Sequence, residues 1–238
     1  MPSDVPSDRP TPAGEADDPY CLTEGEAARL LTGHPWRRFA VLGDSVAEGL
    51  GEPTPGYPPQ PWAERIAVEL RLLAPDMRYF NLGWRNTPAA AVRAGQLPEA
   101  LAFRPDLALV ACGGFDALRS GYDAEAVTAE LRAIVAALRE QGAQVLTVGM
   151  FDGSRSPLVP EQYREPLRER LHSLSARTAE VAAELGALHF DLTAHPASDR
   201  RDVYSSDGRH GSGRSHAIAA AAAVRRLGAH LGTGPAAG

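Results

Sequence analysis

Ser45 and His210 are the residues whose types and neighbours suggest nucleophilic chemistry. Ser45 closes the turn Gly43-Asp44-Ser45, which ends an apolar run, and His210 follows Asp207 by three residues. An aspartate and an imidazole at that spacing can meet on one tight turn. A serine that gives its proton to a histidine held by an aspartate is an activated nucleophile for acyl transfer. Alternatively, both segments are ordinary surface turns, which Gly, Asp and Ser form readily.

The residues around Ser45 predict a strand followed directly by a helix. Residues 39–42 lack polar alternation, which is typical of a strand covered on both faces of a parallel sheet. Gly43 permits a sharp turn, and residues 46–50 can begin a helix. Ser45 is then expected at a helix N-terminus, where free N–H groups favour a developing oxyanion. The placement is similar to a nucleophile elbow, although the Gly-x-Ser-x-Gly pattern is absent.

Strand and helix patterns alternate along the rest of the chain. Strands are predicted over residues 39–42, 78–82, 107–112, 144–150 and 187–192. Helices are predicted over residues 23–31, 62–73, 124–141, 161–185 and 214–231, with another that ends near residue 102. This alternation implies right-handed crossovers, so we predict an α/β fold: a three-layer α/β/α sandwich around a doubly wound, five-stranded parallel sheet. The loops that follow its strands should converge on one site.

Composition indicates one ordinary globular domain. The chain has 238 residues, of which 44% are hydrophobic and 23% charged, so we expect a single domain over residues 21–238. Residues 1–20, rich in Pro, Ser and Asp, are expected to be a disordered tail. They show neither a basic nor an apolar region of a secretory signal, so we expect a cytoplasmic protein. The apolar stretch at residues 216–224 is too short to span a membrane.

Several classes of partner are excluded by charge and by missing motifs. The net charge of -6 argues against a nucleic-acid-binding surface. Cys21 and Cys112 are too few for a disulfide framework. With no metal-ligand cluster or nucleotide-binding fingerprint, no cofactor and no metal are expected. The oligomeric state has no signature in the sequence.

Four short blocks, in this order, resemble the SGNH or GDSL-type serine hydrolases, a family of esterases and lipases with a flavodoxin-like fold. The resemblance extends over residues 36–232. The blocks are Gly43-Asp44-Ser45, Asn81-Leu82-Gly83, Gly113-Gly114-Phe115-Asp116-Ala117-Leu118, and Asp207-Gly208-Arg209-His210 with His216 beyond it. The resemblance implies that Ser45 is the nucleophile, that His210 is the general base, and that Asp207 orients His210.

Two positions depart from the family's pattern, and both belong to the oxyanion hole. The family's second block ends with a glycine that donates its N–H, and the corresponding residue here is Asn86. Asparagine tolerates a left-handed backbone, so its N–H is still expected to point inward, or its amide to act instead. The family's third block supplies an asparagine amide, and here that residue is Phe115, which cannot donate. Losing one such donor costs about a hundredfold to a thousandfold in turnover.

The remaining donors and the substrate follow from the loops around the serine. Gly83 or Asn86 would assist the Ser45 N–H in holding the oxyanion. Arg85 is either a solvated charge, a donor or a clamp for a substrate carboxylate, and the loop from Trp84 to Pro88 is expected to line the pocket. We therefore expect a hydrolase acting on a small-molecule acyl ester or acylated metabolite. An acyltransferase or tailoring enzyme using the same acyl-enzyme, and a binding protein without turnover, are the alternatives.

Overall fold

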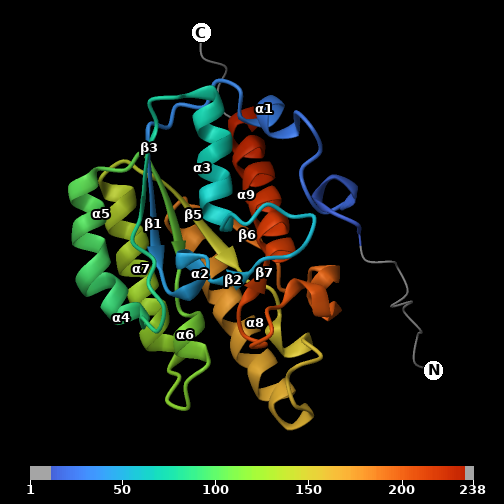
Figure 1. Ribbon diagram of the computed structural model, residues 1–238. Helices are drawn as coiled ribbons and strands as arrows, with labels where there is room; N and C mark the ends of the chain where they lie inside the picture. Colours follow the sequence, from blue (N-terminus) through green and yellow to red (C-terminus); the bar gives the residue numbers. More distant parts are fainter. Residues whose placement is uncertain (1–11, 234–238) are drawn as a thin grey trace.

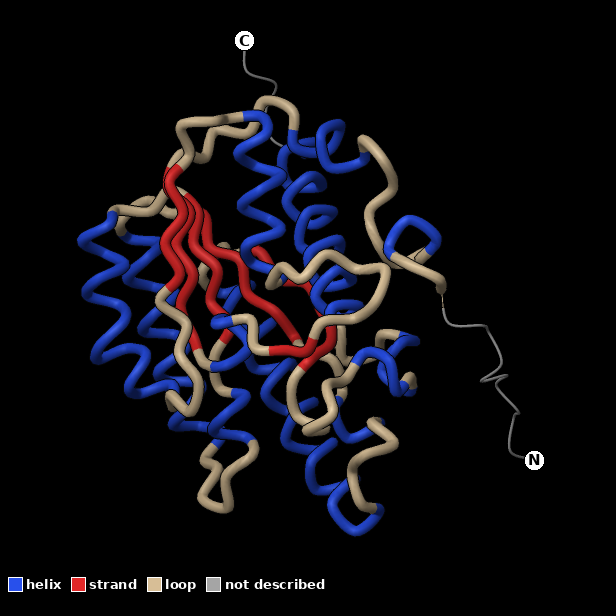
Figure 2. Tube along the Cα trace, viewed as in Figure 1, coloured by secondary structure: helices blue, strands red, loops and turns tan. Residues whose placement is uncertain are grey.

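A five-stranded parallel sheet forms the centre of the computed structural model, which describes residues 12–233 (Figures 1 and 2). Its strands are β1 (Arg38–Gly43), β3 (Arg78–Asn81), β4 (Leu107–Ala111), β5 (Gln144–Gly149) and β6 (Leu188–Asp191). Their order is β3-β1-β4-β5-β6, and every neighbouring pair is parallel. This is the flavodoxin-like order, in which the first sheet strand pairs with both the second and the third. The predicted fold is confirmed.

Helices cover both faces of the sheet, as Figure 1 shows. One layer contains α1 (Glu26–Leu31), α3 (Trp62–Leu73) and α9 (Gly213–Thr233). The other contains α5 (Leu97–Phe103), α7 (Ala124–Glu140) and α8 (Glu161–Glu184). Phe39 and Val41 of β1 pack in the first layer, whereas Ala40 and Leu42 pack in the second. Because both faces are buried, the strand needs apolar residues at successive positions.

The helix α7 illustrates how local sequence sets these elements. Asp123 caps its first turn by accepting hydrogen bonds from the Glu125 and Ala126 N–H groups at 3.0 and 3.1 Å. Its buried face includes Val127, Leu131, Ile134, Val135 and Leu138, at helical spacing. The predicted helix over residues 124–141 is therefore confirmed to within one residue.

Short elements lie among the loops that connect the long ones. They are α2 (Ser45–Glu48), α4 (Ala89–Ala91), α6 (Gly114–Ala117), the π-helical η2 (Val92–Gln96) and the 3₁₀ helices η1 (Glu15–Asp17), η3 (Gly153–Arg155), η4 (Pro196–Asp199) and η5 (Arg201–Val203). A second, two-stranded parallel sheet pairs β2 (Gly51–Glu52) with β7 (Gly211–Ser212). The sequence patterns did not predict this small sheet.

The prediction of a disordered tail over residues 1–20 is wrong for residues 12–20. This stretch contains η1, and Asp18 within it is only 4% exposed. Glu15 forms an ion pair of 2.8 Å with Arg65 of α3. Buried polar contacts, rather than an apolar pattern, hold the segment in place, so composition alone indicated disorder. Residues 1–11 lie outside the described part of the chain.

No helix within residues 12–233 is both long enough and apolar enough to cross a membrane. Cys21 and Cys112 are both buried and free.

Candidate active site

Ser45 is the first residue of α2, at the point where β1 ends. Asp44 caps this helix by accepting a hydrogen bond from the Val46 N–H at 3.0 Å. Gly43 adopts a φ of 145°, and a Cβ there would lie 1.9 Å from the Ala111 carbonyl oxygen. Only glycine fits this turn, which releases the chain from the sheet and leaves Ser45 half-buried at its carboxyl edge.

Gln96 holds the same turn through both atoms of its side-chain amide, and sequence reasoning missed it. Its Oε1 accepts from the Gly43 N–H at 2.8 Å, and its Nε2 donates to the Gly43 carbonyl at 2.9 Å. Gln96 is the last residue of η2, and π-helical segments are frequent at functional sites. A polar residue in a helical pattern predicts a solvated side chain, so nothing local pointed to this contact.

Asp44 connects the serine turn to the turn after β4. Its Oδ2 accepts a hydrogen bond from the Phe115 N–H at 3.0 Å, while its Oδ1 accepts from Val46. Burial raises the pKa of Asp44 to about 6, although the hydrogen bonds from Phe115 and Val46 oppose this rise. The side chain of Phe115 is half-buried, and the Arg119 guanidinium lies 5.6 Å from its ring centroid. Position 115 therefore carries an apolar ring with a cation close to its face.

Gly83 has its backbone N–H already engaged. The Asn81 Oδ1 accepts that N–H at 2.8 Å, and the Asn81 Nδ2 donates to the Ala47 carbonyl at 2.9 Å. A Cβ at Gly83 would lie 2.3 Å from the Glu48 nitrogen, so glycine is needed for close packing against α2. Because its N–H is occupied, Gly83 is a packing residue here and not the free donor that the sequence left open.

Asn86 has the left-handed backbone that was expected of it. Its φ is 59°, and it is exposed in the loop after β3. Only one other non-glycine residue in the described chain, Arg104, has a positive φ. Asparagine thus occupies a position with the backbone conformation of a glycine, as its place at the end of the second block predicts.

Arg85 and Trp84 form the exposed edge of this loop. The Arg85 Nη2 lies 2.5 Å from the Glu48 Oε1, and the Arg85 N–H donates to Glu48 Oε2 at 2.7 Å. The Arg85 charge is therefore already paired, which argues against the free substrate clamp. Trp84 is 64% exposed, and the backbone N–H of Trp84 donates to the Gly43 carbonyl at 3.1 Å. The loop thus presents an aromatic surface beside the serine turn.

Asp207 and His210 meet on one turn. The Asp207 Oδ2 lies 2.6 Å from the His210 Nδ1, and its Oδ1 accepts from the Arg209 and His210 N–H groups at 2.9 and 3.0 Å. Burial raises the pKa of Asp207, but these hydrogen bonds outweigh it and hold the pKa at about 2. Because an ionised carboxylate only accepts, Nδ1 carries the proton and Nε2 is left as a base.

The small sheet attaches this turn to the segment that follows Ser45. β2 begins three residues after α2 and pairs with β7, which begins directly after His210. The Ser206 N–H donates to Glu52 Oε2 at 2.8 Å, and the Glu52 N–H donates to Ser205 Oγ at 3.0 Å. Within residues 12–233, however, no hydrogen bond joins Ser45 Oγ to the His210 ring.

A second group of serine, aspartate and histidine lies on the loop after β5 and on α8. Ser154 Oγ donates to Asp152 Oδ1 at 2.5 Å, and His172 Nε2 lies 3.0 Å from Asp152 Oδ2. The aspartate stands between the other two, so the histidine cannot take the serine proton. Ser154 is also only 3% exposed. This arrangement braces the loop and does not activate a nucleophile.

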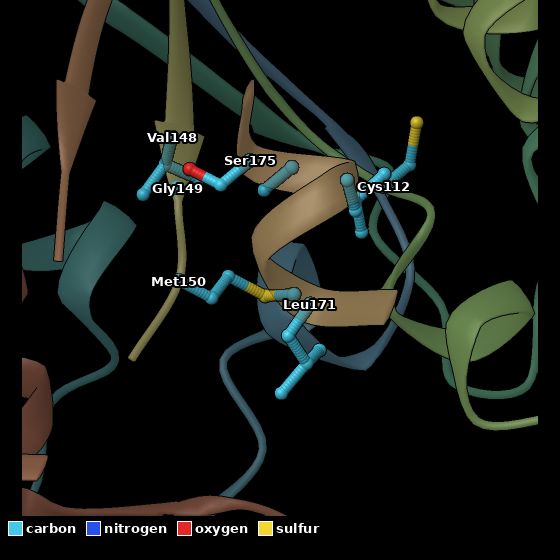
Figure 3. A pocket seen from close by; sticks show the side chains of 8 residues that line it. Cys112, Val148, Gly149, Met150, Leu171 and Ser175 are labelled. Carbon is cyan, nitrogen blue, oxygen red and sulfur yellow. The ribbon is translucent and has the colours of Figure 1, made fainter. Parts of the chain in front are cut away.

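A cavity of about 10 Å³ lies between β4, β5 and α8 (Figure 3). Figure 3 shows the Met150 side chain extending toward Leu171 there, while the sulfur of Cys112 points away. The cavity adjoins the third block, because a Cβ on Gly114 would lie 2.7 Å from Met150 Cε. Such a volume holds about one water molecule, so it cannot receive an acyl group.

His216, the further histidine of the last block, is enclosed in α9. Burial lowers its pKa to about 4, so it is neutral at physiological pH. Among the residues that the structure describes, no three His, Cys, Asp or Glu side chains are arranged to hold a metal ion.

Comparison with known proteins adds a family and a set of related folds. The GDSL-like Lipase/Acylhydrolase family model matches residues 41–223. Axe2, an acetylxylan esterase from Geobacillus stearothermophilus, superposes with a TM-score of 0.65 at 19% identity, covering 83% of this chain and 95% of its own. TesA superposes with a TM-score of 0.61 at 21% identity, covering 80% and 97%. None of the curated proteins gives a significant match.

Other solved Axe2 structures carry substitutions described as catalytic. In these the replaced residues are a serine, an aspartate and a histidine, and the histidine follows the aspartate by three positions. At these identities, the superpositions show a shared fold.

Proposed function

Because this chain belongs to the GDSL-like lipase/acylhydrolase family, a family of esterases, we propose that it cleaves a small acyl ester through an acyl-enzyme on Ser45. The observation that carries the proposal is the contact of 2.6 Å between Asp207 and the His210 ring, on a turn bonded to the segment after Ser45. The same spacing of aspartate and histidine in the catalytic mutants of Axe2 supports the assignment.

The reaction follows the general order of serine hydrolysis. Ser45 Oγ attacks the ester carbonyl while its proton passes to His210 Nε2, and the Asp207 carboxylate stabilises the imidazolium that forms. His210 then returns the proton to the leaving alcohol as the carbon–oxygen bond breaks. Water, deprotonated by His210, releases the acid from Ser45. Catalytic hydrogen bonds often tighten only when substrate is bound, so the serine and histidine need not be bonded beforehand.

The oxyanion of the tetrahedral intermediate would be held by the backbone N–H groups of Ser45 and Asn86. Gly83 is unavailable because Asn81 occupies its N–H. The left-handed backbone of Asn86, with a φ of 59°, supports this role, because it is the conformation that a glycine at this position would adopt. With Phe115 in place of an amide donor, we expect turnover about a hundredfold to a thousandfold below that of a site with a third donor.

The substrate is proposed to be a short acyl ester with a larger alcohol. The cavity beside the third block is too small for an acyl chain, so the acyl group would lie on the open surface near Phe115. Trp84 offers an exposed aromatic face for an alcohol such as a sugar. The acetylxylan esterase activity of the structural relative Axe2 agrees with an acetyl ester of a saccharide.

Hydrolysis of p-nitrophenyl acetate and butyrate tests the proposal. The wild-type protein should hydrolyse both, and Ser45→Ala should reduce the rate to background. Ser154→Ala is the matched control, because it removes the serine of the second Ser-Asp-His group and should leave the rate unchanged. A reactive phosphonate should label Ser45 alone. Labelling that survives Ser45→Ala would show that the nucleophile is another residue.

An acyltransferase, which would use the same acyl-enzyme, is the second candidate function. The exposed side chain of Trp84 beside the site favours it, because an alcohol or amine acceptor can stack there. Adding candidate alcohols to the p-nitrophenyl acetate assay separates the two. A transferase forms the acetylated acceptor in preference to free acetate, whereas a hydrolase forms acetate throughout.

A further inference from the structure

Arg214 is a buried cation placed directly behind the proposed catalytic turn, here defined as residues 205–212. It is the second residue of α9, four positions after His210, and its side chain is 4% exposed. Its Nε donates to Asp18 Oδ2 at 2.7 Å, and its Nη1 donates to Asp202 Oδ1 at 2.8 Å. A buried guanidinium needs such partners because an unpaired charge in the interior is costly.

These contacts clamp the turn at both of its ends. Asp202 precedes the turn, and Arg214 follows it. The Asp202 carbonyl also accepts from Ser212 Oγ at 2.5 Å, so the two ends are joined by side chain and by backbone. Outside this clamp, the turn is attached by the two-residue strands β2 and β7 and by hydrogen bonds of Glu52 in β2 to Ser205 and Ser206. So short a ladder is only marginally stable by itself.

The third member of the clamp, Asp18, comes from the N-terminal segment over residues 14–21, here called the strap. The Asp18 Oδ2 also accepts from the Tyr57 hydroxyl at 2.8 Å, and its Oδ1 accepts from the Tyr20 N–H at 3.1 Å. Burial raises the pKa of Asp18, but the Arg214 hydrogen bond and the other donors outweigh this and lower the pKa. Asp18 is therefore an anion that faces Arg214.

The strap lies along the loop that precedes α3, where Figure 1 shows the blue N-terminal segment beside the cyan loop. The Glu15 N–H donates to the Gly56 carbonyl at 3.0 Å, and the Tyr20 ring packs edge-on against His195 with centroids 4.6 Å apart. The strap precedes residues 41–223, the stretch that matches the family model.

We propose that Asp18 and Arg214 are positioning residues for His210, so that one residue of the strap, Asp18, supports the catalytic site. Asp18 holds Arg214 against the fold, Arg214 holds the end of the catalytic turn, and the turn presents the His210 ring. This inference rests on the proposed function, since it assigns His210 as the base. A displacement of about 1 Å at the reacting atoms is enough to lower turnover by up to about a hundredfold.

Asp18→Asn tests the inference, because it removes the charge while keeping the size of the side chain. Well below its melting temperature, the variant should lose about tenfold to a hundredfold in kcat on p-nitrophenyl acetate. KM should change by less than about twofold, since the substrate's own contacts remain. The downfield proton NMR resonance of the His210 Nδ1–H, which reports its contact with Asp207, should broaden or disappear.

Glu15→Gln is the matched control. It breaks the ion pair of 2.8 Å between the same strap and Arg65. In the described part of the chain, the side-chain hydrogen bonds of Arg65 go to Glu15, Pro58 and Gln60, which lie outside the turn. Its kcat and its His210 resonance should match the wild type even where its melting temperature is lower. Tyr57→Phe removes one hydrogen bond to Asp18 and retains every charge, so it provides a milder variant if Asp18→Asn does not fold, with kcat lowered about twofold to tenfold.

The outcomes separate this inference from the proposed function. Lower melting temperature in Asp18→Asn, with kcat and the resonance unchanged, would overturn the positioning role and leave the strap as a stabilising segment. If the wild-type protein shows no Ser45-dependent turnover, the proposed function fails. The NMR resonance of the His210 Nδ1–H is then the remaining test. Its loss in Asp18→Asn but not in Glu15→Gln supports the positioning role of Asp18. Its persistence in both variants refutes that role.

Discussion

A single hydrogen bond joins Asp44 to Phe115, two residues 71 positions apart in the chain, with the Phe115 N–H donating to Asp44 Oδ2 at 3.0 Å. β1 and β4 are neighbours in the sheet, and their loops leave it on opposite sides. Ligands of doubly wound folds bind at this switch point. One buried carboxylate therefore joins the serine turn to the turn after β4.

The burial of Asp44 predicts a specific dependence of stability on pH. Its pKa is about 6 in the folded protein, above the ordinary value of 3.8, so the folded state binds this proton more tightly. The resulting stabilisation is complete below about pH 4 and is lost as the pH rises through about 6. It amounts to at most about 3 kcal/mol.

Urea unfolding of the wild type and of Asp44→Asn, from pH 4 to pH 8, measures this contribution. The free energy of unfolding of the wild type, relative to the variant, should fall as the pH rises. Taking the difference between the two proteins cancels the pH dependence that comes from the other titrating groups, because both proteins share them. A difference that stays constant over this range would show that Asp44 titrates at its ordinary pKa.

Restoring an amide at position 115 should increase turnover. Phe115→Asn adds a hydrogen-bond donor beside the proposed oxyanion position, and the backbone N–H that binds Asp44 is retained. We expect kcat on p-nitrophenyl acetate to rise by about tenfold or more. Phe115→Leu is the control, because it also removes the ring but adds no donor, and its rate should not rise. Equal or lower turnover in a folded Phe115→Asn variant would contradict our account of the oxyanion hole.

Substitutions of Asn86 distinguish a backbone donor from a side-chain donor. Asn86→Gly keeps the N–H and suits a φ of 59°, so kcat should stay within about threefold of the wild type. Asn86→Ala should destabilise the protein by about 1 kcal/mol, since alanine tolerates this conformation poorly. Steady-state kinetics and thermal unfolding measure the two effects. A hundredfold loss of kcat in Asn86→Gly would mean that the amide is the donor instead.

Asp207 should remain ionised throughout the working pH range. Its pKa of about 2 lies below the ordinary value, so its contribution to stability is present above about pH 4 and is lost only as the pH falls through 2. Asp207→Asn should therefore lower kcat on the order of a thousandfold or more at every pH from 5 to 9. A loss confined to part of this range would indicate that Asp207 itself titrates there.

The sequence by itself determined the fold and the candidate residues. Strand and helix patterns are local, and a strand such as β1 is apolar throughout because both its faces are buried. The fold class follows from the order of these elements, and the loops after their strands bring Ser45 and His210 to the same sheet edge. The left-handed backbone of Asn86 was also predicted from the sequence, since asparagine is the residue that best replaces glycine in a left-handed turn.

Only the tertiary structure decided which groups are free to act. The N–H of Gly83 donates to Asn81, and the charge of Arg85 is paired with Glu48. Gln96 forms hydrogen bonds with Gly43 from a helix that is distant in the sequence. The strap follows the same rule, because the Asp18 carboxylate is paired with Arg214, nearly two hundred positions away. Hydrogen bonds and ion pairs between distant segments depend on the packing of the whole chain, and no local pattern records them.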